Sequence, residues 1–560
     1  MNSVNQLVLI LPSLPLVSAL LTHLLSGSMG RRVSQISVAG GTASFLIAAI
    51  LLGSILSGHD VAQVSAGGSW GSLLFDPLSA LMGLLISGIS LLVRIYSVRY
   101  MAEEAGYGRF FVLLDLMTAA LLIMVAAGDL ITLLISWHLI GVLLYFLLGQ
   151  DTRSKSAYRY GFWTFITYRF GDVPLLLAAA VLFHTFHTWS LPEIFAALAN
   201  NPDSTTVFDL PVSEVVGALI ALSAFARSAQ FLLHTWLPYT MDGPTPVSAL
   251  MHAGIVNAGG FLINRFAPVF AYTDDVLHWV FIVGVFTAVI GSVLMLSQHD
   301  IKKSLGYSTM GQMGFMIMEC GVGAFSLAIF HLIAHGLFKG TLFLSAGGII
   351  GEARHDDGVP KDDLYTFIVE RRPARARQPW LLMAGVTLAV PVAVLLISHL
   401  MVAPNLFQKQ GAIILLFFGW VTGAQLLFAT YNMRSENPWR LVTLIVISFT
   451  VVVVGYTLIS HAFDVFLYPD PEFGTLLYEA AGIDYSWFVV LVVFASAVIV
   501  LGWLRAYYTE RGRRGRSPSH WWRNFYALVW REFHILDIYT GLTRGVLALS
   551  ARVNVWLRWG

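Results

Sequence analysis

Apolar runs long enough to cross a lipid bilayer recur along almost the whole chain, with short polar breaks between them. In lipid such runs fold as helices, because a helix satisfies its backbone polar groups within the segment. Hydrophobic residues make up 57% of the sequence and charged residues 12%, about half the charged share of an average soluble domain. The pattern predicts an all-α polytopic membrane protein with about 15 transmembrane helices. The expected spans cover residues 4–25, 36–56, 77–95, 110–127, 130–148, 160–183, 212–233, 246–270, 276–297, 304–323, 324–351, 380–402, 412–430, 441–459 and 487–507. The first run, without a basic segment before it, is expected to be a transmembrane helix rather than a signal peptide.

Basic residues are concentrated in alternate loops, which predicts the orientation in the membrane. By the positive-inside rule these loops face the cytoplasm, so the N-terminus is expected outside and the C-terminus inside. The basic loops contain Arg31, Arg32, Arg94, Arg99, Arg109, Arg153, Lys155, Arg159, Lys302, Lys303 and the lysine and arginine residues of 354–377, 434–440 and 511–516.

The C-terminal segment has a different composition from the rest. Residues 521–560 mix Trp, Tyr and Leu with five arginines. This mixture predicts an amphipathic helix that lies on the cytoplasmic surface or against a partner. A short final span is the weaker alternative.

His331, His335 and Lys339 form the clearest candidate site. They are spaced four residues apart within an apolar run, so one helix face carries all three. A single buried histidine is more often a satisfied core residue. Three titratable groups in register are expensive in lipid and favour an ion pathway.

A second candidate site surrounds an interruption between two apolar runs. Arg227, His234, Asp242 and His252 flank Pro238, Gly243, Pro244 and Pro246. Helix breaks at membrane depth are tolerated where the backbone lines a cavity or is buried in protein, and transporters use such breaks. An ordinary loop is the alternative interpretation.

Other ionisable residues within apolar runs are weaker candidates. Arg169 and Asp172 are close enough in sequence to form a pair, with equal chances of a structural or a functional role. Asp76 begins a run, which favours helix capping. The remaining candidates are His138, Asp115 and Glu319.

Several functional classes are excluded or disfavoured. The chain has no glycine-rich phosphate loop, no nucleophile elbow, and only one cysteine, Cys320, which cannot build a metal site alone. The His331–His335 spacing could suit zinc, but Lys339 and the lack of a carboxylate nearby in the sequence argue against it. No nucleic-acid partner and no cofactor are expected for this chain.

Three stretches resemble the antiporter-like membrane subunits of respiratory complex I and of Mrp-type cation/proton antiporters. They are RSAQFLLHTWLPYTMDGPTPVSALMHA, HDIKKSLGYSTMGQMGF and FHLIAHGLFKGTLFLSAG; YSVRYM and RFGDV also match. The resemblance is close over residues 76–352. It implies two inverted repeats of five helices, each with a broken helix and a half-channel, and proton transfer along buried Lys, His and Glu residues joined by water.

The resemblance assigns residues to this pathway and also shows departures. Arg227 stands where the family has a channel lysine, and an arginine hardly releases its proton. His138 stands where the family has a glutamate after Trp137. In the second repeat the usual lysine is missing and only His399 is near. The expected pathway residues are therefore His138, Arg227, His252, His331, His335, Lys339, Asp115, Arg169, Asp172, Glu319 and His399.

The resemblance also implies a division of the chain into five regions. These are N-terminal helices at 1–109, a first repeat at 110–270, a degenerate second repeat at 271–430, C-terminal helices at 431–508 and an amphipathic cytoplasmic tail at 509–560.

With its departures and basic tail, the sequence most resembles the DabB family, the membrane subunits of DAB-type inorganic-carbon pumps of autotrophic bacteria. That resemblance implies a multi-pass protein of the bacterial inner membrane in contact with lipid. It implies H⁺ or Na⁺ influx that drives CO2 hydration on a cytoplasmic DabA-like partner with a zinc site like that of β-carbonic anhydrases. The alternatives are a proton-pumping subunit of a complex I, hydrogenase or Mrp-type complex, and a scaffold with inactive half-channels.

Overall fold

The computed structural model describes residues 3–353 apart from short gaps at 59–61, 66–69, 152–153, 207–208, 241–242, 274 and 299. It also describes 438–482, 520–557, residues 385, 388–394 and 396–397, and a few positions within 493–501. The predicted span at 412–430, more than half of the one at 380–402, most of the one at 487–507, and the candidate residues Asp242 and His399 lie outside the described residues.

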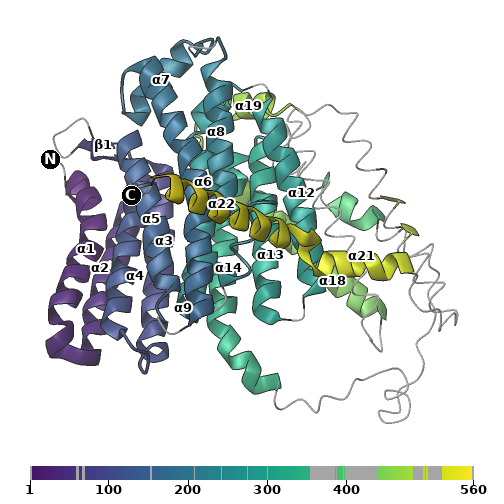
Figure 1. The fold of residues 1–560 in the computed structure, drawn as a ribbon. Helices are drawn as coiled ribbons and strands as arrows, with labels where there is room; N and C mark the ends of the chain where they lie inside the picture. The colour runs from purple at the N-terminus through teal and green to yellow at the C-terminus, as the bar shows by residue number, and fades with distance from the viewer. Residues whose placement is uncertain are drawn as a thin grey trace.

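The described chain is almost entirely helical, and most helices run side by side in one bundle (Figure 1). The N-terminal part contains α1 (Ser3–Met29), α2 (Ser34–Leu56), α3 (Pro77–Tyr100), α4 (Tyr107–Val125), α5 (Leu130–Leu148) and α6 (Lys155–Phe186). A two-stranded antiparallel hairpin, β1 (Ala62–Ser65) and β2 (Ser72–Phe75), joins α2 to α3, with Ala62 opposite Phe75. The short 3-10 helix η1 (Gly30–Val33) turns the chain from α1 into α2.

The middle of the chain contains several short helices separated by breaks, followed by three long continuous ones. They are α7 (Leu191–Asn200), α8 (Val212–Arg227), α9 (Thr245–Ala253), η3 (Ile255–Asn257), α10 (Ala258–Arg265), α11 (Ala267–Phe270), α12 (Val276–Ser297), α13 (Ile301–Gly321) and α14 (Phe325–Ala353). The predicted interruption at the proline cluster is confirmed, because α8 stops at Arg227 and α9 starts at Thr245. The expected continuation of α8 to residue 233 is wrong: Ala229 and Leu232 adopt left-handed backbone conformations, with φ of 47° and 72°.

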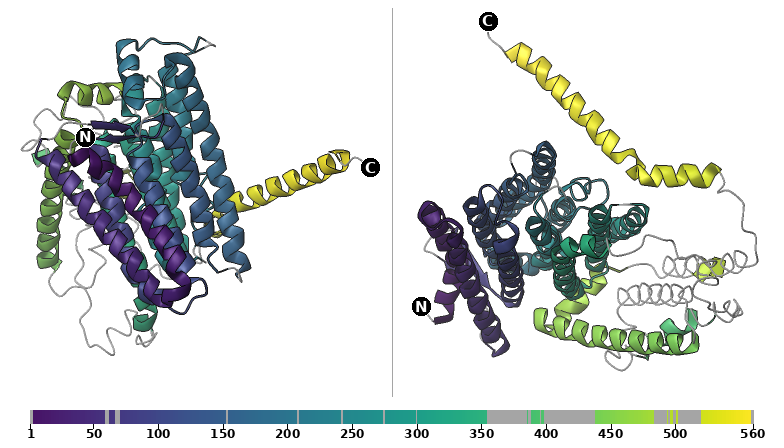
Figure 2. Two further views of the ribbon diagram at one scale, coloured as in Figure 1. Left: turned by 90° about the vertical axis from the view of Figure 1, so that its left-hand side faces the viewer. Right: turned by 90° about the horizontal axis from the view of Figure 1, so that it is seen from below.

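The C-terminal part contains α18 (Pro438–Leu467), α19 (Pro471–Ala480), α21 (His520–Trp530), η5 (Glu532–His534) and α22 (Ile535–Leu557). The short helices α7 and α19 lie at the same end of the bundle (Figure 1). The helix α22 runs across the bundle axis and its far end projects away from the other helices (Figure 2). A final span parallel to the others is therefore not formed at 535–557.

By length and composition, eight stretches of helix in the described part of the chain could cross a membrane, the first being the α1–α2 run of residues 4–56. An all-helical polytopic membrane fold is thus confirmed at this coarser level. Long apolar side chains such as Leu24, Leu46, Phe170 and Leu296 are exposed on the outside of the bundle. Apolar side chains on an outer surface are what a lipid environment selects.

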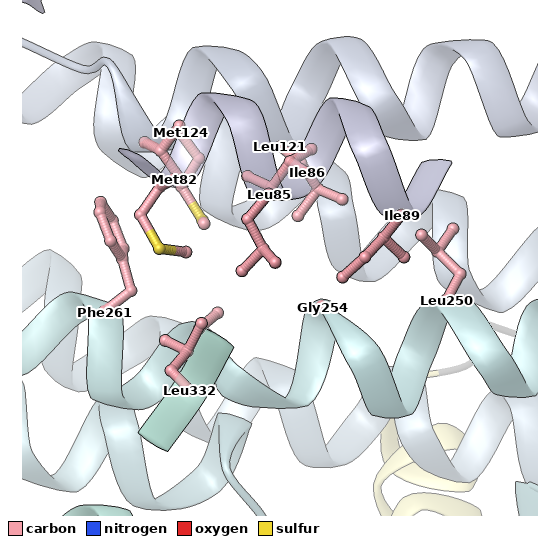
Figure 3. Close-up of a pocket in the computed structure, with 12 residues that line it drawn as sticks. Met82, Leu85, Ile86, Ile89, Leu121, Met124, Leu250, Gly254, Phe261 and Leu332 are labelled. Atoms are coloured by element: carbon pink, nitrogen blue, oxygen red, sulfur yellow. The ribbon is translucent and has the colours of Figure 1, made fainter. Parts of the chain in front are cut away.

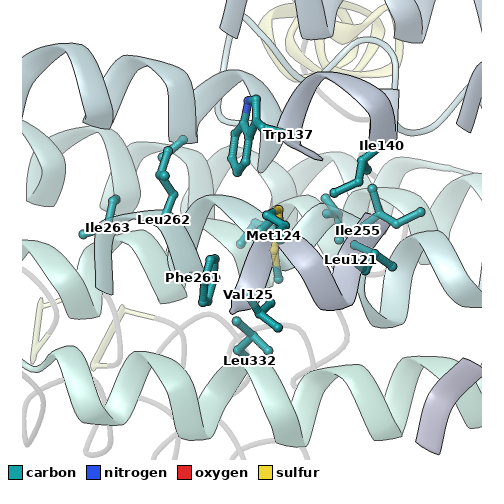
Figure 4. Packing of buried hydrophobic residues seen from close by; sticks show 14 of the residues in the cluster. Leu121, Met124, Val125, Trp137, Ile140, Ile255, Phe261, Leu262, Ile263 and Leu332 are labelled. Atoms are coloured by element: carbon teal, nitrogen blue, oxygen red, sulfur yellow. The ribbon is translucent and has the colours of Figure 1, made fainter. Parts of the chain in front are cut away.

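A continuous core of apolar side chains joins the N-terminal helices to the broken ones. Trp137 and Ile140 of α5, Met124 of α4, Phe261 of α10 and Leu332 of α14 belong to it (Figure 4). This packing holds α14 against α9 and α10, which positions the ionisable face of α14.

The helices α12 and α13 approach each other more closely than larger residues would allow. A Cβ atom on Gly284 would lie 2.4 Å from the backbone nitrogen of Met318, and one on Gly314 would lie 2.3 Å from that of Ala288. The glycines therefore permit the close contact that sets the position of α13 beside α14.

Candidate functional site

The three titratable residues of α14 lie on one face of the helix, as predicted, and this face meets α13. His331 is held from both sides of its ring: Nδ1 lies 3.0 Å from Oε1 of Glu319, and Nε2 lies 2.9 Å from Oε1 of Gln312. The structure thus brings Glu319, proposed separately from the sequence, into the same cluster as His331. Gln312 was not foreseen, because a neutral amide gives no electrostatic signal in a sequence.

One and two turns further along α14, His335 and Lys339 are buried. The ring centres of His331 and His335 are 6.3 Å apart. In the described part of the chain, Nε2 of His335 is buried without a hydrogen-bond partner. The ammonium group of Lys339 donates to Oγ of Ser308 at 2.8 Å and has no carboxylate partner among the described residues.

His252 of α9 extends this cluster from the opposite side. Its Nδ1 lies 3.1 Å from Oγ1 of Thr309, and its ring stacks on Phe343 at 4.3 Å between centres. His252 interacts electrostatically with Lys339 and His335. The central line, defined as Glu319, His331, His335, Lys339 and His252, therefore draws on α9, α13 and α14.

The central line has the chemistry of a proton relay. A neutral imidazole can accept a proton on one nitrogen and release one from the other, and a buried lysine gives up its proton more readily than an exposed one. The 6.3 Å between ring centres is too long for direct transfer, so water must join the groups. Buried nitrogens without protein partners are where such water binds.

A second cluster lies between α5, α6 and α8, with Asp172 at its centre. One oxygen of Asp172 lies 2.9 Å from Nδ1 of His138 and 3.1 Å from the guanidinium of Arg169. The other oxygen lies 3.7 Å from the guanidinium of Arg227. The predicted Arg169–Asp172 pair is therefore formed. His138 also contacts the guanidinium of Arg169 through its ring nitrogens.

Arg227 is fixed more firmly than a mobile proton carrier would be. Its guanidinium lies between the rings of Trp137 and Tyr168, 4.2 Å and 4.1 Å from their centres, and donates to the Trp137 carbonyl at 2.6 Å. Two cation–π contacts and a hydrogen bond hold the charge in place. Arg227 thus supplies a fixed positive charge beside Asp172.

His138 lies at the surface of the bundle, with 56% of its side chain exposed. The neighbouring side chains Ile135 and Leu139 are exposed as well. The Asp172 cluster therefore opens onto the outer face of α5 and α6 rather than into the centre of the bundle.

His234 lies in the segment between α8 and α9. The side chain is fully buried, and neither ring nitrogen has a hydrogen-bond partner in the described residues. The ring stacks on Phe231 and lies 6.4 Å from the ring of Tyr307. His234 is thus not part of the Asp172 cluster, although Arg227 of that cluster and His234 both flank the break after α8.

Asp115 lies in a third place, away from both clusters. Its carboxylate forms an ion pair with Arg94 at 2.8 Å and accepts hydrogen bonds from Ser18 and Ser37. The sequence-based placement of Arg94 in a cytoplasmic loop is wrong. Arg94 is a fully buried residue of α3, because Asp115 of α4 compensates its charge there.

The predicted capping role of Asp76 is confirmed. Its Oδ1 accepts from the Ser79 backbone at 2.8 Å at the start of α3. Asp76 also pairs with Arg265 at 2.5 Å. Arg265 was missed as a candidate, although a cation within an apolar run is itself a sequence signal.

The pocket between α3, α4 and the broken helices is apolar. It is lined by Met82, Leu85 and Ile86 on one side and by Gly254 and Phe261 on the other (Figure 3). None of its lining side chains can titrate, so it is not part of the candidate pathway. Among the described residues no three His, Cys, Asp or Glu side chains lie close enough together to bind a metal ion.

Two segments of the chain, which together contain most of the candidate residues, match known protein families. Residues 127–455 match the family described as NADH:quinone oxidoreductase/Mrp antiporter, TM, and residues 70–111 match the complex I chain 5 N-terminus family. The chain therefore belongs to the antiporter-like membrane subunit family of complex I and Mrp antiporters.

Two relatives share very different lengths of this chain. A protein of Halothiobacillus neapolitanus named "Probable inorganic carbon transporter subunit DabB1" is 56% identical over 98% of this chain and 99% of its own length. The chloroplastic NAD(P)H-quinone oxidoreductase subunit 5 of Ipomoea purpurea is 40% identical over 50% of this chain and 39% of its own. The alignment with the first protein thus covers almost all of both chains, whereas the alignment with the second covers only part of each.

Solved structures share the fold at low sequence identity. A chain of the Mrp complex from Dietzia sp. DQ12-45-1b aligns with a TM-score of 0.57 and 23% identity, over 99% of this chain and 60% of that one. A chain of an archaeal membrane-bound sulfane sulfur reductase aligns with a TM-score of 0.60 and 19% identity, over 85% and 100%. These matches show an antiporter-like fold.

Proposed function

We propose that this chain is the proton- or Na⁺-translocating membrane subunit of an inorganic-carbon uptake complex. The observation that carries the proposal is the central line: Glu319, His331, His335, Lys339 and His252 converge inside the bundle from three helices. Buried ionisable groups in a membrane protein mark ion pathways. The full-length similarity to a probable inorganic carbon transporter subunit supports the choice of substrate system.

In the proposed architecture about 15 spans cross the membrane. N-terminal helices at 1–109 precede two inverted five-helix repeats, at 110–270 and 271–430. C-terminal helices at 431–508 and a tail at 509–560 follow the repeats. His399 would belong to the second repeat. The N-terminus would face the periplasm of a bacterial inner membrane. The acidic residues Asp203 and Asp470 near α7 and α19, opposite the basic turns that hold Lys155 and Lys302, support this orientation.

The hydration of CO2 itself would take place on a partner protein. Cation flow through this chain would drive hydration of CO2 on a DabA-like protein with a zinc site, docked on the cytoplasmic side. The helix α22 supports such docking, since Ile538, Leu542, Leu549 and Val553 leave its apolar face exposed. Lipid would cover the remaining outer surface.

The test is co-expression of this chain with a candidate zinc partner in a bacterium that lacks carbonic anhydrase. Growth in air that requires both chains, together with 14C-bicarbonate or CO2 accumulation that collapses with a protonophore, is the expected result. Growth with the partner alone would overturn the proposal. An Na⁺-free medium separates H⁺ from Na⁺ as the coupling ion.

An alternative function is compatible with the same fold. The similarity to NAD(P)H-quinone oxidoreductase subunits favours a proton-pumping role in an electron-transfer, hydrogenase or Mrp-type complex. Purification of the native complex distinguishes the two: a single zinc-containing partner supports carbon uptake, whereas quinone- or hydrogen-handling subunits support the alternative.

A further inference from the structure

The turn between α21 and α22 buries a carboxylate where this segment packs against the bundle. Glu532, Phe533 and His534 have φ angles of 56°, 55° and 59°. Three successive non-glycine residues in the left-handed region are costly and persist only where surrounding contacts enforce them. The side chain of Glu532 is buried as a result, with 5% exposed.

The surroundings of Glu532 lack the usual compensation for a buried carboxylate. Its Oε1 accepts a hydrogen bond from the Tyr239 hydroxyl at 2.8 Å. Its Oε2 is buried without a partner, and no cation pairs with it among the described residues. Burying a carboxyl group without a paired cation is costly, so its presence here favours a functional role over simple packing.

Further polar groups without partners continue from Glu532 into the bundle. The hydroxyl of Tyr307 on α13 neighbours the carboxyl group of Glu532 and makes no close hydrogen bond within the described residues. The ring of Tyr307 lies 6.4 Å from that of His234, whose nitrogens are also without partners within the described residues. Rows of buried, unpaired polar atoms are where internal water binds.

Tyr307 also connects the row formed by Tyr239, Glu532, Tyr307 and His234 to the central line. The two residues that follow it, Ser308 and Thr309, hold Lys339 and His252. Near the opposite end of the row, the ammonium group of Lys303 lies 4.5 Å from the centre of the Tyr239 ring, close to the turn between α12 and α13. Glu532 thus stands between an end of the bundle and its titratable interior.

We propose that Glu532, in the turn of the C-terminal arm formed by α21, η5 and α22 (520–557), is a further proton-carrying residue of the pathway, placed between bulk water and the His234–His252–Lys339 region. The protonated carboxyl group releases its proton through water to an imidazole and becomes a carboxylate, which takes up the next proton from the other side. The step reverses for flow in the other direction. This inference rests on the proposed ion translocation but not on the carbon substrate.

Two substitutions separate a proton carrier from a mere anchor for the arm. Glu532→Gln keeps the length and the hydrogen bond to Tyr239 but cannot exchange a proton. Glu532→Asp exchanges protons but is one methylene shorter. A proton carrier predicts faster flux in the Asp variant than in the Gln variant, with the Gln variant reduced about 100-fold. An anchor predicts the reverse order.

The measurement is proton flux per assembled complex in proteoliposomes under an imposed potential, with the partner present. Asp537→Asn is the matched control, because this carboxylate lies in the same segment and is exposed, and it should behave as wild type. Wild-type flux in Glu532→Gln, or loss of assembly in both Glu532 variants, would overturn the inference. Failure of the wild-type complex to accumulate inorganic carbon would count against the proposed function alone, since the flux order still tests Glu532.

Discussion

Nδ1 of His138 lies 2.9 Å from the carboxylate of Asp172, across the contact between α5 and α6. The family resemblance places a glutamate, facing a cation, at the position that His138 occupies in this chain. Here the nearby acid is Asp172 of α6, and its carboxylate lies close to His138, Arg169 and Arg227. The charge balance of the cluster therefore depends on Asp172.

Asp172→Asn should weaken assembly of the protein. It leaves the guanidiniums of Arg169 and Arg227 without a counter-charge, and breaking a buried ion pair costs about 3–5 kcal/mol. The measurement is the yield of folded protein after detergent extraction. Asp203→Asn, on an exposed loop residue, is the control. The double variant Asp172→Asn, Arg227→Gln should recover part of the yield, because it removes one of the two uncompensated charges. An unchanged yield of Asp172→Asn would show that Asp172 does not balance these charges.

His138→Gln should assemble normally and lose transport. Glutamine preserves the approximate size and the hydrogen bonding to Asp172, but it cannot titrate. The readout is inorganic-carbon uptake in air, with His184→Gln on the exposed end of α6 as the matched control. If uptake by the His138 variant equals that of wild type, His138 contributes packing only.

Lys339→Arg and Lys339→Met should both abolish proton flux, by about 100-fold or more. Arginine keeps the positive charge near Ser308 but does not release its proton, and methionine removes the charge. Flux in proteoliposomes is compared with that of Lys155→Met, an exposed residue at the start of α6. Retained flux in the Arg variant would mean that Lys339 acts only through its fixed charge.

Asp115→Asn should lower thermal stability because it leaves Arg94 buried and unpaired. The double variant Arg94→Met, Asp115→Leu should be less destabilised than the single one, since it removes both charges together. Thermal unfolding followed by light scattering measures both. A stable Asp115→Asn protein that has lost proton flux would instead place Asp115 in the pathway.

Much of the local structure follows from the sequence alone. Apolar runs require helices in lipid, so the bounds of α5 and α12 were predicted without error, at 130–148 and 276–297. Pro238 and Pro244 interrupt a helix, and Pro246 suits the first turn of a new one, so the break before α9 was predictable. The one-face arrangement of His331, His335 and Lys339 follows from helical spacing.

Only the tertiary structure decided which charges meet. Sequence spacing cannot show that Glu319 contacts His331 from another helix, that Arg94 is neutralised by Asp115, or that Glu532 reaches Tyr239 nearly three hundred residues away. Helix periodicity orders residues along one helix, whereas ion pairs between helices depend on packing, and here the close approach of α12 and α13 at Gly284 and Gly314 sets that packing. The sequence determined the helices and the residues available for proton transfer; the packing of helices determined which of these residues lie together.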